Sequence, residues 1–317
     1  MTASNQTLGL IAGEGVFPAM VLRGAKQAGL RVVVVGLHSC CDETLFADAD
    51  AFYEAGVARL GRWIRIFRKE HAHQVIMAGR VRKTRMLDRS PWRQWLAYLP
   101  DWTSIKVWYF GAKDRRNDNL LRAVADEMRR KGVELIDSTA YCQEAMATEG
   151  TLGNNRLTPA QTADADLGWS IAKEMGRLDI GQSVAVKDKD IIAIEAIEGT
   201  DAMIARAGEL CRSGGWTLIK VANARQDMRM DVPTIGTTTI EKLAAARAGC
   251  VVLEAGKTVI LEKQKVLELA RGEWIDQHFN CCLIGGSGTG KTHVATAWGL
   301  PSAGWASASN SPPPRDW

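Results

Sequence analysis

Short apolar runs and helical patterns alternate along the first part of the chain. The apolar residues 8–12 and the β-branched run 32–35 predict two strands, because uninterrupted apolar runs of this length are typical of strands covered on both faces. Between them, residues 16–29 predict a helix with Pro18 near its first turn, where proline is tolerated. A further buried strand is expected at 74–78. Strand, helix and strand in this order predict a parallel sheet.

The rest of the chain continues this alternation. Apolar residues recur with a helical period between 117 and 131, and Gly132 follows in the usual C-terminal place. Later helices are expected at 159–176, from 201 onward and at 238–248, and strands at 133–136, 183–186, 191–195, 217–221 and 250–254. The predicted fold class is α/β with two domains: a Rossmann-like parallel sheet over 1–137 and a second α/β domain over 138–268. A poorly ordered tail is expected over 269–317.

The turn after the first predicted strand contains Gly13 and Gly15. The dinucleotide-binding fingerprint requires a third glycine, and Phe17 and Pro18 stand in its place. Two interpretations stay open: a backbone loop that lets a phosphate or a sugar approach, and a tight turn without a ligand. Gly79, which ends the strand at 74–78, is a further candidate for substrate binding.

Two polar clusters each follow a predicted strand of the second domain. The first cluster spans 195–201 and contains Glu195, Glu198 and Asp201; the second spans 226–236. In open α/β sheets, ligands bind beyond the carboxyl ends of the strands. Carboxylates two to four residues apart, mixed with arginine and glycine, suit a metal-bound phosphate. The alternative is a surface network of salt bridges.

The segment between Gly79 and Phe110 interleaves basic and aromatic residues. This composition fits a nucleic-acid surface, where aromatic rings stack on bases. It also fits a surface beside a membrane, where Trp and Tyr lie at the polar boundary and arginine meets anionic head groups. A third interpretation is a helical hairpin with aromatic core positions and a solvated basic face.

Composition narrows the function classes. The 317 residues are 46% hydrophobic and 24% charged, as in an ordinary soluble globular protein, and the net charge of +4 is too small to indicate a nucleic-acid partner by itself. The seven cysteines show no CxxC spacing, and the five histidines show no zinc-ligand spacing. No run approaches the ~20 apolar residues of a membrane span. These features predict a cytoplasmic protein.

Five ordered blocks of the chain, between about 8 and 268, resemble the LpxI family of UDP-2,3-diacylglucosamine pyrophosphatases. The blocks are LGLIAGxGxxP from Leu8, DxLLR from Asp118, GRLDIGQ from Gly176, AIEGTDAM from Ala196, and KVA from Lys220 followed by QDMRxDVPTIG from Gln226. The resemblance implies a Mg²⁺-dependent hydrolase that splits the pyrophosphate of UDP-diacylglucosamine to give UMP and 2,3-diacylglucosamine 1-phosphate (lipid X) in lipid A biosynthesis. It also implies two domains with the substrate between them. The basic-aromatic segment would then face an acylated, anionic substrate at the inner-membrane surface, with the protein peripheral to that membrane and no nucleic-acid partner.

The same resemblance implies that the two acidic clusters form the site that binds the metal ion and the attacking water. Pyrophosphate hydrolysis requires neutralisation of the phosphoryl oxygens and a group that orients the attacking water. Asp231, central in the family motif, and then Asp227 are the candidate catalytic residues, and both together with Glu198 are the candidate Mg²⁺ ligands. Arg229 and Lys220 are candidate phosphate clamps. The other candidate substrate-binding residues are Gly13, Gly15, Gly79, Asp118, Gln182, Thr200, Asp201 and Gln226.

The C-terminus departs from the family, whose members end in a short apolar strand. Here residues 285–292 form a full Walker A pattern behind the apolar run 281–284, and the surroundings resemble the IstB-type ATP-binding proteins of insertion sequences. Too little chain follows for a Walker B carboxylate or a phosphate-loop sheet. The segment 269–317 is therefore interpreted as a foreign, non-functional fragment that supplies neither catalytic nor core residues. On this interpretation, truncation near Ala270 leaves activity unchanged or raises it. Two further hypotheses stay open, a catalytically impaired remnant that binds UDP-sugar or lipid, and a phosphate-loop NTPase.

Overall fold

The first domain is built on a five-stranded parallel sheet in a computed structural model of the chain. The structure describes residues 6–38, 40–41, 46–81, 99–111, 117–151, 157–223, 227–230, 232–271 and 280–285. The strands are β1 (Thr7–Ala12), β2 (Arg31–Leu37), β3 (Ala51–Ala55), β4 (Gln74–Ala78) and β5 (Glu134–Leu135), in the spatial order β3-β2-β1-β4-β5. Their parallel pairing confirms the predicted Rossmann-like sheet. The strand order reverses between β1 and β4, and ligands bind at such a switch point.

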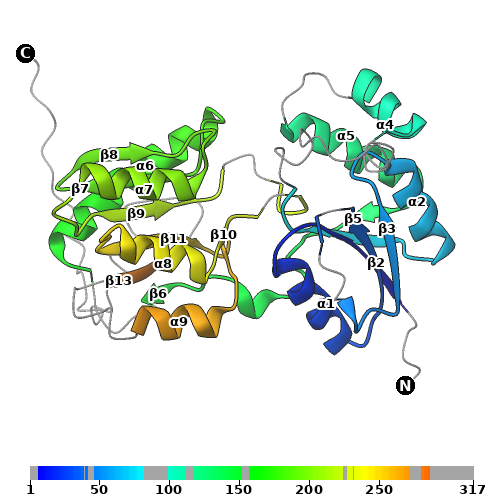
Figure 1. The fold of residues 1–317 in the computed structure, drawn as a ribbon, viewed down its shortest axis with the longest axis horizontal. Coiled ribbons are helices and arrows are strands. Elements are labelled where there is room, and N and C mark those ends of the chain that lie inside the picture. Colours follow the sequence, from blue (N-terminus) through cyan, green and yellow to red (C-terminus); the bar gives the residue numbers. More distant parts are fainter. Residues whose placement is uncertain are drawn as a thin grey trace, which may run out of the picture.

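Helices cover both faces of this sheet (Figure 1). One face carries α1 (Phe17–Gln27), and the other carries α2 (Leu60–Lys69) and α5 (Asn117–Arg130). The short helix α4 (Trp102–Lys106) runs into a π-helical turn, η3 (Val107–Gly111), and packs beside α2. Sequence analysis did not predict α2 or β3.

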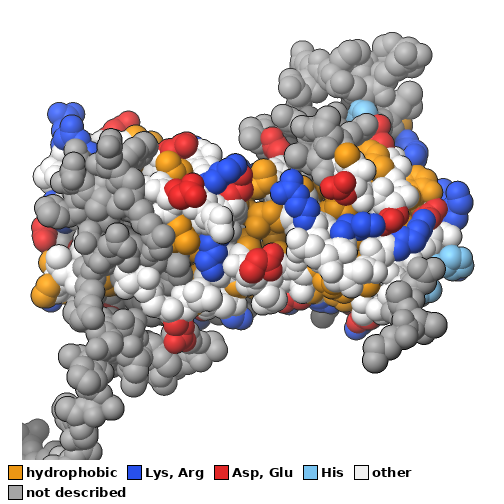
Figure 2. All heavy atoms as spheres, turned by 90° about the horizontal axis from the view of Figure 1, so that it is seen from below, with side chains coloured by type: hydrophobic (Ala, Val, Ile, Leu, Met, Phe, Trp, Pro, Cys, Tyr) orange, Lys and Arg blue, Asp and Glu red, His pale blue; other side chains and the backbone are white. Residues whose placement is uncertain are grey.

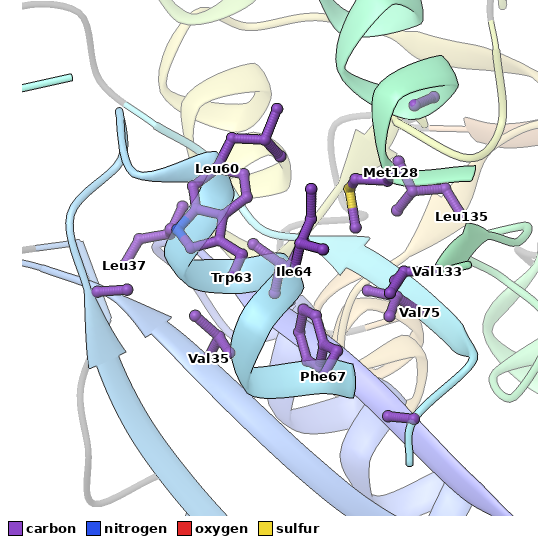
Figure 3. Packing of buried hydrophobic residues seen from close by; sticks show 14 of the residues in the cluster. Val35, Leu37, Leu60, Trp63, Ile64, Phe67, Val75, Met128, Val133 and Leu135 are labelled. Atoms are coloured by element: carbon purple, nitrogen blue, oxygen red, sulfur yellow. The ribbon is translucent and has the colours of Figure 1, made fainter. Parts of the chain in front are cut away.

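The helix α2 shows why this face is stable. Leu60, Trp63, Ile64 and Phe67 recur at helical spacing and are buried. Figure 3 shows these side chains directed onto the sheet and toward residues around the end of α5. Burying a large apolar side chain contributes about 1.5–3 kcal/mol relative to leaving it exposed. The missed helix therefore follows from a regular apolar stripe.

The second domain contains a six-stranded mixed sheet of order β6-β13-β11-β9-β7-β8. Its strands are β6 (Gly150–Thr151), β7 (Ser183–Lys187), β8 (Asp190–Ile194), β9 (Thr217–Lys220), β11 (Cys250–Ala255) and β13 (Asn280–Gly285). The long helix α6 (Pro159–Arg177) covers one face, while α7 (Thr200–Leu210), α8 (Thr237–Ala245) and α9 (Lys263–Arg271) pack around the other core. Two short strands, β10 (Thr234–Ile235) and β12 (Val259–Ile260), pair separately, and a 3-10 turn, η4 (Gln143–Ala145), precedes the domain. The strands and helices expected between 159 and 254 are all present.

The strand β13 corrects one expectation about the C-terminus. Its six residues pair in parallel with β11, from Cys250 opposite Asn280 to Ala255 opposite Gly285, and it also pairs antiparallel with β6. The expectation that nothing beyond Arg271 contributes to the second domain is therefore wrong for residues 280–285. Apart from residues 269–271 and 280–285, the tail that was expected to be poorly ordered lies outside the described residues, and with it the Walker A pattern beyond Gly285.

Candidate active site between the two domains

The loops after β1 and β4 contact each other at the switch point of the first sheet. The Gly13 N–H donates to Ala78 O at 2.8 Å, and Glu14 and Arg80 exchange two backbone hydrogen bonds of 2.9 Å. A Cβ at Gly79 would lie 2.7 Å from the Gly13 carbonyl carbon, and Gly79 has a φ of +92°. Both glycines are therefore required by a close approach of two backbones.

Gly15 differs from these two glycines. It adopts a φ of +103°, yet a Cβ built on it would meet no atom within 4 Å. Its backbone conformation requires glycine, and open space remains above it. This geometry fits both interpretations of the loop: a backbone that a phosphate or a sugar can approach, and a tight turn without a ligand.

The segment 227–230 of the second domain lies against the end of β4 in the first domain. Ser138, 1% exposed, places its Oγ 2.8 Å from Met77 O and 2.9 Å from Arg229 O. The single hydroxyl proton donates to one of these carbonyls at a time. The Ser138 N–H also donates to Met228 O at 3.1 Å. Ser138 thus ties the Gln226–Asp231 motif to the strand that ends at Gly79.

Apolar contacts hold the same segment on the first domain. Met228 and Val232 pack against the core that includes α1, and Met230 packs against the core under α2. The side chains of this motif therefore reach both faces of the first sheet. In Figure 1 the chain crosses between the two domains at this place.

The Asp227 carboxylate is held by Arg229. Arg229 donates to both carboxylate oxygens, at 2.8 and 2.6 Å, and its N–H donates to the same group at 3.1 Å. These hydrogen bonds hold the pKa of Asp227 below its ordinary value, although burial alone would raise it. The positive charge of the nearby Arg122 lowers the same pKa further. The hydrogen bond to Asp227 likewise raises the pKa of Arg229. Asp227 is therefore ionised at neutral pH.

Arg122 links a second motif to this place. It lies on α5 in the block that begins at Asp118, and its charge acts on Asp227. Asp126 on the same helix acts on Arg229. Two blocks about a hundred residues apart in sequence therefore meet at the edge of the first domain.

A second polar cluster lies at the carboxyl edge of the second sheet. Lys220 ends β9 and donates to Thr200 Oγ1 at 3.0 Å, and that hydroxyl donates to Glu195 Oε1 at 2.7 Å. Lys220 and Glu195 are both buried. Gln182 lies alongside, because its carbonyl accepts from the Val221 N–H. Buried polar groups of this kind are normally fully hydrogen-bonded, but Glu195 Oε2 and Gln182 Oε1 have no hydrogen-bond partner within the described part of the chain.

An ion pair between the half-buried Lys173 and the buried Glu254 fixes the start of the loop that joins the two clusters. The Glu254 carboxylate, 2% exposed, accepts from the Ala222 N–H at 2.8 Å and from Lys173 Nζ at 2.5 Å. Lys173 Nζ also donates to Ala222 O at 3.2 Å. Both polar backbone groups of Ala222 are therefore held.

The structure divides the predicted site residues. It brings Gly13, Gly79, Asp227 and Arg229 together, and it gathers Gln182, Thr200 and Lys220 in the second cluster. Glu198 pairs with Arg206 at 3.0 Å, and Asp201 pairs with Lys242 on α8 at 2.5 Å. Asp231 and Gln226 lie outside the described residues, as does the side chain of Asp118.

Some residues that shape the site were missed. Ser138, Lys173 and Glu254 carry no motif, and their only signal is a place at or near the end of a predicted strand or helix. Arg122 stood inside a quoted block and Glu195 inside the first polar cluster, but neither was given a role of its own. Local spacing does not show which strand ends meet.

The described residues do not assemble a metal site. No group of three His, Cys, Asp or Glu side chains within them lies close enough to hold a metal ion. Asp227 and Glu198 are each engaged by an arginine. None of the described helices is long and apolar enough to cross a membrane.

Fold and site together define a class: a two-domain α/β protein with polar motifs at a Rossmann-like switch point and at the facing second domain. Family comparisons specify it further. Residues 7–145 match the LpxI N-terminal domain and residues 148–275 match the LpxI C-terminal domain. A relative from Caulobacter vibrioides (strain ATCC 19089 / CIP 103742 / CB 15), named UDP-2,3-diacylglucosamine pyrophosphatase LpxI, is 32% identical over 274 residues, 83% of this chain and 93% of the relative. The chain belongs to the LpxI family.

Solved structures overlap with this chain only weakly. The biotin carboxylase domain of a thermophilic 2-oxoglutarate carboxylase bound to ADP is 13% identical, with a TM-score of 0.24, over 65% of this chain and 32% of that chain. A UDP-N-acetylmuramate:L-alanyl-gamma-D-glutamyl-meso-diaminopimelate ligase from Neisseria meningitides is 9% identical, with a TM-score of 0.26, over 89% of this chain and 78% of that chain. These values support no inference about function.

Proposed function

We propose that this chain hydrolyses the pyrophosphate bond of UDP-2,3-diacylglucosamine to UMP and 2,3-diacylglucosamine 1-phosphate, a step of lipid A biosynthesis. The observation that carries the proposal is the 32% identity to a pyrophosphatase of that name, which extends over 93% of the relative. The geometry supports it, because the family motif 226–236 meets the glycine loops at the switch point of the first sheet, where an open α/β sheet binds its ligand.

The cations and the glycine loops are assigned to the diphosphate. Arg229 carries a planar guanidinium suited to phosphate oxygens, and Lys220 provides a point charge at the second cluster. Backbone at Gly13, Gly15 and Gly79 allows a phosphate or sugar to approach closely. The side chains proposed to bind the rest of the substrate are Asp118, Gln182, Thr200, Asp201 and Gln226.

Asp231 is assigned to the attacking water. A carboxylate can accept a proton from water and orient it toward phosphorus. Asp227, the second candidate catalytic residue, has both oxygens engaged by Arg229. In this arrangement it orients Arg229, and it can act on the water only when the guanidinium moves to the substrate.

Mg²⁺ dependence is part of the proposal, with Asp231, Asp227 and Glu198 as the proposed ligands. A divalent cation would neutralise charge on the phosphoryl oxygens. The pairing of Asp227 and Glu198 with arginines does not fit a ready Mg²⁺ site, so no step is assigned to the ion. Metal removal tests this part separately: EDTA should abolish turnover, and added Mg²⁺ should restore it. Unchanged turnover in EDTA would exclude a role for Mg²⁺ in the reaction, while the assignment as a pyrophosphatase would still hold.

Asp231→Asn tests the assignment of the water-orienting group. We expect turnover to fall by several orders of magnitude with little change in substrate binding, because this carboxylate acts mainly in the transition state. The matched control is Asp190→Asn, an exposed carboxylate at the start of β8, which should leave turnover unchanged. UMP release is followed by chromatography. Full turnover in Asp231→Asn would exclude Asp231 from the mechanism.

The protein is proposed to act in the cytoplasm at the surface of the inner membrane. The substrate carries two acyl chains, so it resides in a bilayer or a micelle rather than free in water. A hydrolase for such a molecule has to meet it at that surface.

A further inference from the structure

The helix α2 has a second face that the core does not use. Opposite its buried apolar stripe it exposes Arg62, Arg65, Arg68 and Lys69. A helix with an apolar face in a core and a purely cationic face in solvent has no structural need for so many like charges, which repel one another. By contrast, acidic and basic side chains are interspersed over both domains on the face seen in Figure 2.

Three of these cations line a pocket of about 470 Å³. The pocket lies between α2, α4 and the end of α5, and Lys131 contributes a fourth positive charge. Its remaining lining among the described residues comes from Gly61, Ile64 and Thr103. None of the four cations forms an ion pair with any residue that the structure describes. A pocket with this lining attracts an anion.

Exposed aromatic rings lie on α4, which contributes Thr103 to the pocket, and on η3, which follows α4 directly. Trp102 is 69% exposed, Trp108 51% and Tyr109 71%. The position of α4 is fixed, because Asp101 accepts from the Arg62 N–H and Ser104 Oγ accepts from the Leu60 N–H. Large aromatic side chains left in water on an anchored element are typical of an interaction surface.

One end of this surface lies at the edge of the sheet that holds the candidate site, and the other end lies at the opposite edge, where Arg68 and Lys69 precede β4 and Lys131 precedes β5. All strands of the first sheet are parallel, so their carboxyl ends share one edge. The helix α2 begins at Leu60, just after β3 ends at Ala55, and α4 is bonded to that start of α2. The loops at Gly13 and Gly79 follow β1 and β4 at this edge. Figure 1 shows α2, α4 and α5 grouped at one corner of the domain.

We propose that this basic-aromatic face, formed by Arg65, Arg68, Lys69, Lys131, Trp102, Trp108 and Tyr109, docks the enzyme on an anionic phospholipid bilayer. The cations bind phosphate-bearing head groups, and the aromatic rings enter the interface between head groups and acyl chains. The proposal rests on the proposed function only in its purpose, since an enzyme for an acylated substrate has to meet that substrate at a bilayer. Binding itself is independent of catalysis.

Vesicle co-sedimentation tests the docking face. The full chain is mixed with vesicles of phosphatidylcholine alone, or of phosphatidylcholine with phosphatidylglycerol, at low salt. The test variant is Arg65→Gln/Arg68→Gln/Lys69→Gln. The matched control, Arg23→Gln/Lys189→Gln/Arg212→Gln, removes the same charge from exposed positions on α1 and in two loops of the second domain. Trp102→Ala tests the aromatic part, and inorganic phosphate is added as a competitor.

We expect the wild type to bind only the anionic vesicles. Each cation at such a surface strengthens binding about fivefold, so the triple test variant should bind roughly a hundredfold more weakly, with the control close to wild type. Trp102→Ala should weaken binding severalfold. Equal binding by test and control variants would overturn the proposal. So would displacement by millimolar phosphate, which would indicate a free-anion site, or nucleic-acid binding in place of vesicle binding.

Hydrolysis of substrate dispersed in detergent separates this proposal from the proposed function. The triple test variant should release UMP from detergent-dispersed UDP-diacylglucosamine at the wild-type rate and lose activity only on substrate held in anionic vesicles. Vesicle binding without any hydrolysis would support the docking face and contradict the proposed function. Hydrolysis in detergent without vesicle binding would support the proposed function and contradict the docking face.

Discussion

The strand β13 should be essential for the stability of the second domain, although it comes from the segment that departs from the family. Two truncated chains test this: 1–271, which ends with α9 and lacks β13, and 1–285, which keeps β13 and removes everything after it. Without β13, the strand β11 loses its partner along six residue pairs. Its residues Val251, Val252 and Leu253, now fully buried, would lie beside an open sheet edge.

The expected loss can be estimated from the backbone pairing. A parallel pair over six residues makes roughly six hydrogen bonds, each with a net contribution of about 0.5–1.5 kcal/mol, and the freed strand regains part of this as chain entropy. We therefore take the low end of this range, about 3 kcal/mol, as the expected loss of the second domain. For a unit of 150–250 residues, 3 kcal/mol corresponds to a Tm lower by roughly 6–12 °C.

Calorimetry and circular dichroism measure this difference. The chain 1–285 should unfold at the temperature of the full chain, and the chain 1–271 should show an earlier transition of the second domain together with reduced UMP release. Equal unfolding temperatures and equal activities for the two truncated chains would refute the reasoning, and would show that 269–317 is dispensable as a whole.

Three further predictions concern the site. Ser138→Ala removes the hydroxyl that lies between two buried carbonyls and should cost about 1–3 kcal/mol and lower turnover, measured by thermal unfolding and UMP release; unchanged values in both would contradict its bridging role. Because Arg229 lowers the pKa of Asp227, the ionised carboxylate stabilises the fold above its unfolded pKa of about 3.9, and this contribution is lost as pH falls through the lower folded pKa. The stability difference between wild type and Asp227→Asn should accordingly be constant at neutral pH and shrink below about pH 4, whereas a difference independent of pH would exclude the charge pair as its cause. Glu254→Gln should be less damaging than Glu254→Ala by about 1–3 kcal/mol in denaturant unfolding, since the amide oxygen still accepts from the Ala222 N–H; identical losses would show that this hydrogen bond contributes little.

The sequence predicts most elements because their apolar periods are regular. Strands at 74–78 and 250–254 and the helix at 159–176 differ from the observed ones by at most one residue at an end. Strand ends also indicate correctly where the polar motifs lie, because Glu195 and Lys220 do sit at carboxyl ends. The parallel first sheet follows from the order of strands and helices alone.

The remaining features depend on contacts between distant residues. Nothing near Ser138 in sequence indicates that its hydroxyl meets a carbonyl 91 residues away. The apolar run 281–284 predicts a strand both before a phosphate loop and at the edge of the second sheet, so the sequence does not indicate that β13 pairs with β11. Likewise, the apolar stripe of α2 is visible in the sequence, but its pocket requires Thr103 from α4 and Lys131 from the turn after α5.

Release of UMP from UDP-2,3-diacylglucosamine by the purified full chain tests the central claim most directly. The substrate is dispersed in detergent with Mg²⁺, and UMP and the diacyl sugar phosphate are quantified together by chromatography and mass spectrometry. We expect both products in equal amounts, and we expect Asp231→Asn to form them several orders of magnitude more slowly than the wild type. Substrate that remains intact, although it binds to the folded protein, would identify the chain as a binding remnant and contradict the proposed hydrolase.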